Sequence, residues 1–392
     1  MDRKALDRAF NPRCVAVVGD KMANGYVWLR NMSTFTGKLY SVQIDPNEIP
    51  GIEQLGVNNC RSLLDIPEPI DYVLVAVPRA VAPRIIRDCI KKGVGGASLF
   101  TSGFAETHSD EGATLQETLT KMAREANLNL IGPNCMGIFN PKLGVRQDIN
   151  QYHGKSGPVG FISQSGTHAI FFSQVGARNG LLISKSVSYG NGAVLDSADY
   201  LDYFADDDET KVIGLYIEGV RDGRRFLDSL RVAARRKPVL VWKGGRGEEG
   251  YRAISSHTGS LASTPVLWDS LVKQYGAMRI DNLDEMILHM KSMAGNLNAA
   301  AKEVRRNPWR LLAKPAEKET RSQNIYDAAR AFAEGAGELD DAVSRMNALR
   351  DARPEGVKSD DPDLKKVLTR LEGSFEKFRA VEDKLWEELS KP

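Results

Sequence analysis

The chain is short of cysteine and of net charge. Its four cysteines are scattered over 392 residues, with no CxxC pair and no cluster of cysteine and histidine. This spacing argues against a disulfide framework and a zinc site, and it suits a reducing compartment. The formal net charge is only +2, which gives no reason to expect nucleic acid or an anionic membrane as a partner. No histidine has a second residue at metal-ligand spacing, so the sequence predicts no metal site.

Long apolar runs are also missing. No stretch is long and apolar enough to cross a bilayer, and the charged start, residues 1–10, lacks the apolar core of a signal peptide. Hydrophobic residues make up 42% and charged residues 27% of the chain, which is ordinary for a soluble globular protein. We therefore expect a cytoplasmic protein, without a membrane partner, that is long enough for two or three domains.

The first 150 residues contain an alternation of apolar strands and helical patterns. Strands are expected at 14–19, 39–42, 72–77, 97–100 and 128–131, with helices at 81–92 and 110–126. This alternation predicts an α/β fold with a doubly wound parallel sheet, whose ligands lie at the carboxyl ends of the strands. The turns at those ends are rich in glycine and proline, which lets backbone N–H groups approach a nucleotide. The first turn is not GxGxxG, so a Rossmann-like scaffold without a ligand is the alternative.

A second α/β unit begins near Gly157. Its first strand, 158–162, leads into the start of a helical pattern over 168–179 through Ser163, Gln164, Ser165, Gly166 and Thr167. The free N–H groups and the dipole at such a helix start favour an anion. The alternative is an ordinary serine N-cap. For His168, inside this helix, we expect a structural role.

Two chemically active side chains follow later strands of this unit. Strands are expected at 182–187, 212–217 and 238–242, with helices at 195–205 and 224–235. Glu218 comes directly after the second of these strands, and His257 lies among small residues after the third. An accessible neutral imidazole is a nucleophile near neutral pH, and phosphorus is a suitable electrophile for it. The alternatives are a capping or salt-bridging glutamate and a solvated or helix-capping histidine.

Six motifs, in this order along the chain, resemble the nucleotide-diphosphate-forming acyl-CoA synthetases, which are relatives of the succinyl-CoA synthetase α subunit. They lie at 15–19, 131–137, 163–166, 216–219, 243–246 and 256–262. The resemblance covers about residues 1–295. It implies a Rossmann-like CoA-binding domain over 1–150, followed by a flavodoxin-like ligase domain with a phosphohistidine loop over 151–295.

The resemblance also implies roles for single residues. His257 would carry a phosphoryl group between an acyl phosphate and a nucleotide, and Glu218 would orient and stabilise the phosphohistidine. The phosphate would be seated by Gly259 and by the helix start, Ser163 to Thr167. Coenzyme A would contact the strand-end turns at Gly19, Asp20, Lys21, Val77, Pro78, Arg79, Thr101, Ser102, Gly103, Phe104, Asn134 and Cys135.

Three features depart from the family pattern, the third being the C-terminal segment 296–392, where many family members continue into a further α/β domain. Asp20 and Lys21 stand where the first turn usually has small residues. A carboxylate there repels a pyrophosphate unless Lys21 or other protein contacts compensate. In addition, nothing in the chain resembles an ATP-grasp domain. The resemblance therefore implies that ATP or GTP, with Mg, binds on an ATP-grasp β-type subunit of a hetero-oligomer.

The last segment, 296–392, is poor in strand-forming residues and rich in Ala, Glu, Lys and Arg. Helices are expected near 322–351 and 361–390, with a break at 354–356. Apolar residues from Leu364 to Leu389 recur at near-heptad spacing, which predicts a buried stripe. The stripe packs on the chain's own body or in an intramolecular hairpin, or it docks another subunit.

Together these observations predict the α-type subunit of an acyl-CoA synthetase that forms ADP or GDP. It would interconvert a small carboxylic acid, CoA and a nucleoside triphosphate with acyl-CoA, the diphosphate and phosphate. One alternative is a non-catalytic CoA- or acyl-CoA-binding subunit of a larger complex. Another is a nicotinamide-dependent dehydrogenase, which the missing glycine fingerprint disfavours.

Overall fold

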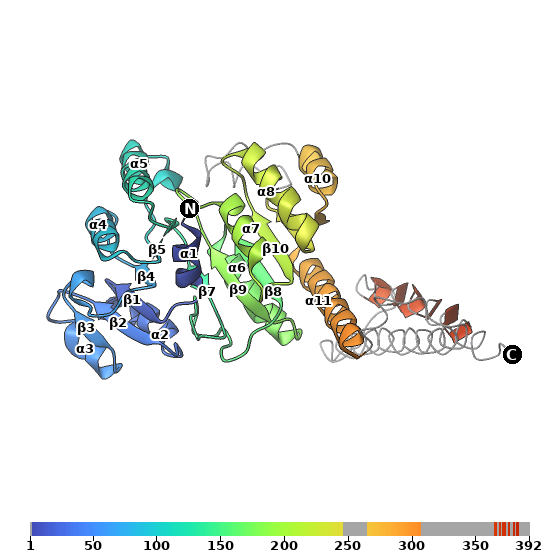
Figure 1. Cartoon of the computed structure of the whole chain (residues 1–392), viewed down its shortest axis with the longest axis horizontal. Helices are drawn as coiled ribbons and strands as arrows, with labels where there is room; N and C mark the ends of the chain where they lie inside the picture. Colours follow the sequence, from blue (N-terminus) through green and yellow to red (C-terminus); the bar gives the residue numbers. More distant parts are fainter. Residues whose placement is uncertain are drawn as a thin grey trace. The chain divides into compact units, whose positions relative to one another are not determined.

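The computed structural model describes residues 2–245 and 265–306, together with some of the residues between 364 and 383. The chain divides into two units, Met1–Ala299 and Ala300–Pro392. In the described residues the first unit contains two six-stranded sheets with helices packed against them (Figure 1). The α/β fold class expected from the sequence is thereby confirmed.

The first sheet is parallel throughout and has the order β3-β2-β1-β4-β5-β6. Its strands are β1 (Cys14–Val18), β2 (Lys38–Val42), β3 (Asn58–Cys60), β4 (Tyr72–Val75), β5 (Gly96–Leu99) and β6 (Leu130–Ile131). All five residues of the central strand β1 are buried. Val15 and Val17 belong to the apolar cluster on one face, and Ala16 and Val18 to the cluster on the other. Burial on both faces explains why β1 is a continuous apolar run.

The second sheet has the order β12-β11-β10-β8-β9-β7. Its strands are β7 (Gly137–Phe139), β8 (Val159–Ser163), β9 (Ile183–Ser188), β10 (Val212–Ile217), β11 (Val239–Lys243) and β12 (Met278–Ile280). Every pair is parallel except β7 with β9, where Ile138 stands opposite Val187. By its pairing β7 therefore belongs to the second sheet, although it precedes residue 151.

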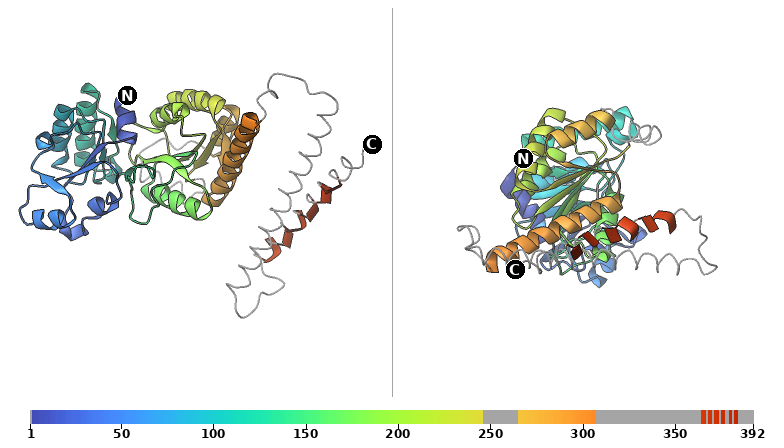
Figure 2. Two further views of the ribbon diagram at one scale, coloured as in Figure 1. Left: turned by 60° about the horizontal axis from the view of Figure 1, so that its bottom comes forward. Right: turned by 90° about the vertical axis from the view of Figure 1, so that its right-hand side faces the viewer.

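Helices cover both faces of each sheet (Figure 2). On the first sheet, α1 (Arg3–Phe10), α2 (Val27–Asn31) and α3 (Ile49–Gln54) share one face, and α4 (Ala82–Lys92) and α5 (Asp110–Glu125) share the other. On the second, α7 (Ser197–Asp206), α8 (Gly223–Arg236) and α10 (Pro265–Gln274) pack opposite α6 (Gly166–Arg178) and α11 (Leu283–Arg306). Because helices cover both faces, the carboxyl ends of the parallel strands lead into connecting turns, where ligands of such folds bind.

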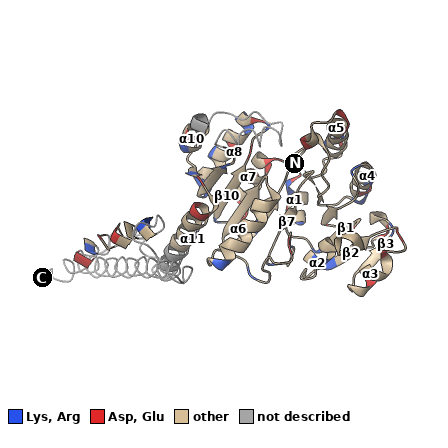
Figure 3. Ribbon diagram, turned by 180° about the vertical axis from the view of Figure 1, so that it is seen from behind, with Lys and Arg blue, Asp and Glu red and all other residues tan. Residues whose placement is uncertain are grey.

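Charged residues lie mainly on the helices and turns, and the strands contain few of them (Figure 3). The helix α6 has a single charged residue, Arg178, in its last turn. Among the residues that the structure describes, no helix is both long enough and apolar enough to span a membrane.

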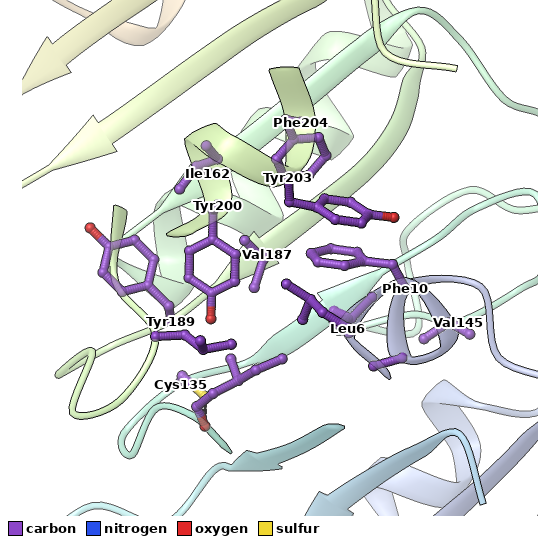
Figure 4. Packing of buried hydrophobic residues seen from close by; sticks show 14 of the residues in the cluster. Leu6, Phe10, Cys135, Val145, Ile162, Val187, Tyr189, Tyr200, Tyr203 and Phe204 are labelled. Atoms are coloured by element: carbon purple, nitrogen blue, oxygen red, sulfur yellow. Dashed lines mark hydrogen bonds between the residues drawn. The ribbon is translucent and has the colours of Figure 1, made fainter. Parts of the chain in front are cut away.

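The short helix α1 joins the cores of the two sheets (Figure 4). Phe10 stacks on Tyr203 of α7, with ring centroids 4.4 Å apart and an interplanar angle of 12°, and it meets Phe204 edge-on. The Tyr203 hydroxyl donates a hydrogen bond of 2.9 Å to Asp7. One apolar cluster, which includes the fully buried Leu6, therefore runs from the first sheet to the second.

Lys185 on β9 is a buried cation, with only 1% of its side chain exposed. Its Nζ lies 2.7 Å from an oxygen of Asp207 and 2.8 Å from an oxygen of Glu209. The hydroxyl of Thr210 also donates to Asp207. A buried ammonium group is tolerated when it is paired and hydrogen-bonded in this way, so we assign Lys185 to the support of the second sheet.

In the second unit, the described residues between 364 and 383 are helical. They fall within the helix expected at 361–390. Two members of its apolar stripe, Leu368 and Phe375, are 40% and 56% exposed. The helix expected at 322–351 lies outside the described residues.

Candidate functional site

The predicted anion seat, Ser163 to Thr167, lies at the start of α6. Ser163, the last residue of β8, accepts a hydrogen bond from the Ser165 N–H at 3.2 Å and donates its hydroxyl to the Ser165 carbonyl. Ser165 is the N-cap, and its Oγ accepts from the His168 N–H at 3.4 Å. The first turn of α6 carries no acidic residue, so no carboxylate competes for the positive end of the helix. Thr167 is exposed, and Ser165 and Gly166 are half-buried.

Gln164 links this seat to Glu218. Its Oε1 accepts hydrogen bonds from two successive backbone N–H groups, those of Glu218 at 2.8 Å and Gly219 at 3.1 Å. The backbone N–H of Gln164 donates to the carbonyl of Tyr216 at 3.0 Å. Because both partners of the side-chain amide are donors, the amide oxygen must face them. The amide thus fixes the backbone from which the Glu218 carboxylate projects at the edge of the sheet.

His168 stands beside the seat in an aromatic cluster. Its ring stacks on Tyr216 with centroids 4.0 Å apart and an angle of 13°, and it meets Trp242 edge-on at 4.8 Å. Its Nδ1 lies 2.9 Å from the Oγ of Ser165. Burial lowers the pKa of His168 below its usual value, because desolvation disfavours the charged imidazolium.

The turn after β6 packs tightly on the turn after β9, so the strand ends of the two sheets meet. A Cβ added to Gly190 would lie 2.1 Å from the carbonyl oxygen of Asn134, and the φ of Gly190 is +50°. The Asn191 N–H donates to the Pro133 carbonyl at 3.0 Å, and the Ala193 N–H donates to the Gly132 carbonyl at 2.9 Å. Only glycine fits at position 190 without moving one turn away from the other.

Asn191 extends this contact to the first sheet. Its Nδ2 donates to Glu106 at 2.5 Å and to Gln116 at 2.9 Å. Glu106 in turn accepts from the N–H groups of Gly103 at 2.6 Å and Phe104 at 3.2 Å. A turn of the first domain that was predicted to bind CoA is therefore tied to a turn of the second domain.

Asp20 points inward, away from the strand-end surface. It is 1% exposed, and its carboxylate accepts from the N–H groups of Leu29 at 2.9 Å and Lys21 at 3.1 Å. Burial raises the pKa of Asp20, and these backbone hydrogen bonds oppose that rise. The carboxylate that was expected to repel a pyrophosphate therefore accepts hydrogen bonds from the backbone of Lys21 and of α2.

A cavity of about 290 Å³ opens at the carboxyl ends of β1, β2 and β4. Among the residues predicted to bind CoA, Gly19, Lys21, Val77 and Pro78 line it. Two further cations, Arg61 and Arg84, also line it, as do Asp45, Glu48 and Asp88. The cavity therefore combines apolar walls with basic groups suited to phosphate and acidic groups suited to hydroxyl donors.

The remaining predicted CoA residues lie around the neighbouring turns. Arg79 donates to the carbonyl of Gly103 at 2.7 Å and pairs with Glu111 at 2.7 Å. Thr101 donates its hydroxyl to the Val77 carbonyl at 2.5 Å. Ser102 lies in the turn after β5, and Asn134 lies in the turn after β6, where its N–H donates to the Thr101 carbonyl at 3.1 Å.

Two of the predicted CoA residues have buried side chains. Phe104 is fully buried. Cys135 is 4% exposed, and burial raises the pKa of its thiol to about 12. Any contact of these two residues with a ligand would come from the backbone.

His257 and Gly259, predicted to carry and to seat the phosphoryl group, lie outside the described residues. Within the described ranges, no three side chains among His, Cys, Asp and Glu gather as metal ligands would.

The sequence alone did not single out Arg61, Arg84, Glu106 or the amide of Asn191. Arg61 directly follows β3, a strand whose residues Asn58–Cys60 are not apolar and gave no strand signal. Arg84 falls in the first turn of a correctly predicted helix. Arg61 therefore follows a strand that the sequence did not reveal, and Arg84 lies within a helix, so the strand ends predicted from the sequence reached neither residue.

Two stretches of the chain match known domain families. Residues 13–141 match the CoA binding domain family. Residues 156–293 match the succinyl-CoA ligase like flavodoxin domain family.

Similar proteins extend over the same region. Acetate–CoA ligase (ADP-forming) I of Archaeoglobus fulgidus is 37% identical over 300 residues, which is 74% of this chain and 43% of that protein. The α subunit of acetate–CoA ligase (ADP-forming) II of Pyrococcus furiosus is 36% identical over 286 residues, 72% of this chain and 61% of that one. This chain thus spans less than two thirds of the length of either relative.

A solved structure shares the fold. Dinucleotide forming acetyl-coenzyme A synthetase 1 of Ca. Korarchaeum cryptofilum, in complex with phosphate and ADP, aligns with a TM-score of 0.68 over 99% of both chains, at 24% identity. At that identity the likeness concerns the fold alone.

Proposed function

By its two domains this chain belongs to the nucleotide-diphosphate-forming acyl-CoA synthetases, and we propose that it is the α-type subunit of such an enzyme. The proposed reaction interconverts a small carboxylic acid, CoA and ATP with acyl-CoA, ADP and phosphate. We take ADP as the diphosphate, and acetate as the first acid to test, because the relatives' names contain both.

The observation that carries the proposal is the coupling of the anion seat to Glu218 through Gln164. A phosphoryl group at the start of α6 would receive backbone hydrogen bonds and the helix dipole. A carboxylate at Glu218 would hold the distal nitrogen of an imidazole that attacks phosphorus, which fixes its tautomer and supports the developing cation. We propose His257, in the segment between β11 and α10 in the sequence, as that imidazole.

The proposed chemistry has three group transfers. Phosphate oxygen attacks the thioester carbonyl, so a C–O bond forms, the C–S bond breaks and CoA leaves as the thiolate. A nitrogen of His257 then attacks phosphorus, so an N–P bond forms, the P–O bond breaks and the carboxylate leaves. Finally the phosphoryl group passes from nitrogen to ADP. The reactants are already activated, so the protein mainly positions them and stabilises phosphoryl charge.

The cavity of the first domain fits the nucleotide end of CoA. Val18, Val42 and Val77 offer an apolar wall for an adenine ring. Lys21, Arg61 and Arg84 offer positive charge for its phosphates. Because Asp20 is engaged by backbone N–H groups, its charge need not oppose the pyrophosphate.

The Pyrococcus relative is named as an α subunit, and we propose a β-type ATP-grasp subunit that binds ATP with Mg as the partner in a hetero-oligomer. We also propose a cytoplasmic location.

Phosphoryl labelling of the full chain, in complex with its ATP-grasp partner, tests this function. With ATP that carries a labelled γ-phosphoryl group, the chain should gain acid-labile, base-stable label. The His257→Ala variant should gain none, while calorimetry should show unchanged CoA binding. A wild-type complex that binds CoA but never takes up label would overturn the proposal in favour of a non-catalytic CoA-binding subunit.

A further inference from the structure

The side chain of His168 has a fixed place in the first turn of α6. Tyr216 covers one face of its ring, and Trp242 packs against it edge-on. These two contacts leave the ring little freedom to rotate. Its Nδ1 is directed at the hydroxyl of Ser165, 2.9 Å away.

The hydroxyl of Ser165 has one proton and two acceptor positions. One position accepts the N–H of His168 itself. If Nδ1 carries no proton, the Ser165 hydroxyl donates its proton to Nδ1. The remaining lone pair of the Ser165 oxygen would then face an incoming phosphate and repel it. If Nδ1 carries a proton, the second acceptor position is used instead. The hydroxyl proton is then available to an oxygen of the phosphoryl group.

We propose that His168 is a positioning residue for phosphoryl transfer, whose Nδ1–H turns the Ser165 hydroxyl into a hydrogen-bond donor toward the phosphoryl oxygens. The inference rests on the function proposed above and assigns His168 no contact with the reacting atoms. The lowered pKa of His168 agrees with a neutral ring, in which the protonated nitrogen is a choice between two tautomers.

The same ring connects the seat to the carboxylate on which the mechanism depends. The Tyr216 hydroxyl lies 3.4 Å from Oε1 of Glu218. His168 stacks on the ring that carries this hydroxyl, and Ser165 contacts the imidazole. The stack therefore holds the Ser165 hydroxyl and the Glu218 carboxylate at a fixed separation, just after two neighbouring strands, β8 and β10.

A double-mutant cycle on the full chain tests the inference. Labelled acetyl phosphate serves as the phosphoryl donor, and its half-saturating concentration for labelling is the readout. His168→Phe keeps the stack on Tyr216 but removes Nδ1, and it should raise that concentration about tenfold, as expected for the loss of one hydrogen bond to a charged oxygen. Ser165→Ala should have a similar effect. The double variant should match Ser165→Ala alone, because both changes remove the same donor.

Two further arms separate this role from a structural one. His168→Asn keeps an N–H near the position of Nδ1 and should restore labelling to within about threefold of wild type. Calorimetric CoA binding should be unchanged in every variant. Additive effects of His168→Phe and Ser165→Ala, or a silent His168→Phe, would overturn the inference while leaving the proposed function intact. A wild-type chain that takes no label would instead remove the proposed function, and this inference with it.

Discussion

The amide of Gln164 is the most informative single group to remove. Replacing it with methionine keeps the length and volume of the side chain but deletes the oxygen that accepts from Glu218 and Gly219. A neutral hydrogen bond contributes about 0.5–1.5 kcal/mol, and an unpaired buried N–H costs about 1–3 kcal/mol. Both N–H groups are only partly buried, so water can replace part of the loss. We expect Gln164→Met to lower the free energy of unfolding by about 1–3 kcal/mol.

The functional effect should exceed the loss of stability. Without the Gln164 oxygen as acceptor, the backbone that carries Glu218 gains conformational freedom and positions the carboxylate less well. Phosphohistidine should therefore accumulate to a lower level, while CoA binding stays unchanged. Gln164→Glu keeps an acceptor and should stay within about 1 kcal/mol of wild type in stability. It should still lose labelling, because its added negative charge repels phosphate.

Urea unfolding followed by circular dichroism, together with phosphoryl labelling, checks both effects. Gln54→Met, at an exposed position in α3, is the matched control and should change neither measurement. If Gln164→Met has wild-type stability and wild-type labelling, the two hydrogen bonds have no role and the reasoning from them is refuted.

Three further results are expected. Gly190→Ala should lower the free energy of unfolding by about 2 kcal/mol or more, because its methyl group would clash with the Asn134 carbonyl. Gly154→Ala has open space around it and should lower the free energy of unfolding by about 1 kcal/mol, from its positive φ alone. Urea unfolding of the two variants measures the difference, and equal losses would contradict the account. Lys185→Met should lower the free energy of unfolding by about 3 kcal/mol, since it leaves the buried Asp207 carboxylate without its ion-pair partner. The exposed Lys121→Met should lower it by about 0.5 kcal/mol or less, and similar values for the two variants would refute this reasoning. A maleimide at pH 8 should label Cys60 first, because Cys60 is half-buried whereas the three other thiols are buried. Burial raises the pKa of all four thiols, to about 11 for Cys14 and about 12 for Cys135, so the buried thiols also offer little thiolate. Mapping labelled peptides as the pH rises checks this, and the three buried thiols should react only on unfolding.

Most of the strands could be predicted because parallel strands buried on both faces read as apolar runs. β1, β4, β8, β10 and β11 lie where the sequence placed them. Three short strands gave no such signal. β3 is polar, and β7 and β12 have only three residues each, so pairing with neighbours rather than local composition creates them.

The candidate site was predictable in its positions but not in its contacts. The strand ends predicted that Ser163 to Thr167 and Glu218 lie at one edge of the sheet, and they do, because parallel strands end at a common edge. Nothing in the sequence showed that the side-chain oxygen of Gln164 accepts a hydrogen bond from the backbone of Glu218, or that the Asp20 carboxylate accepts one from α2. Both contacts join residues on different elements, whose approach only the packed fold determines.

The most direct test of the central claim is a rapid-quench pulse–chase on the complex of this chain with the proposed ATP-grasp subunit, while the complex interconverts acyl-CoA and acid. The account predicts a phosphoryl label on His257 that appears and disappears at least as fast as the enzyme turns over. Steady turnover with no N–P adduct at position 257, or with an adduct that decays more slowly than product forms, would contradict it.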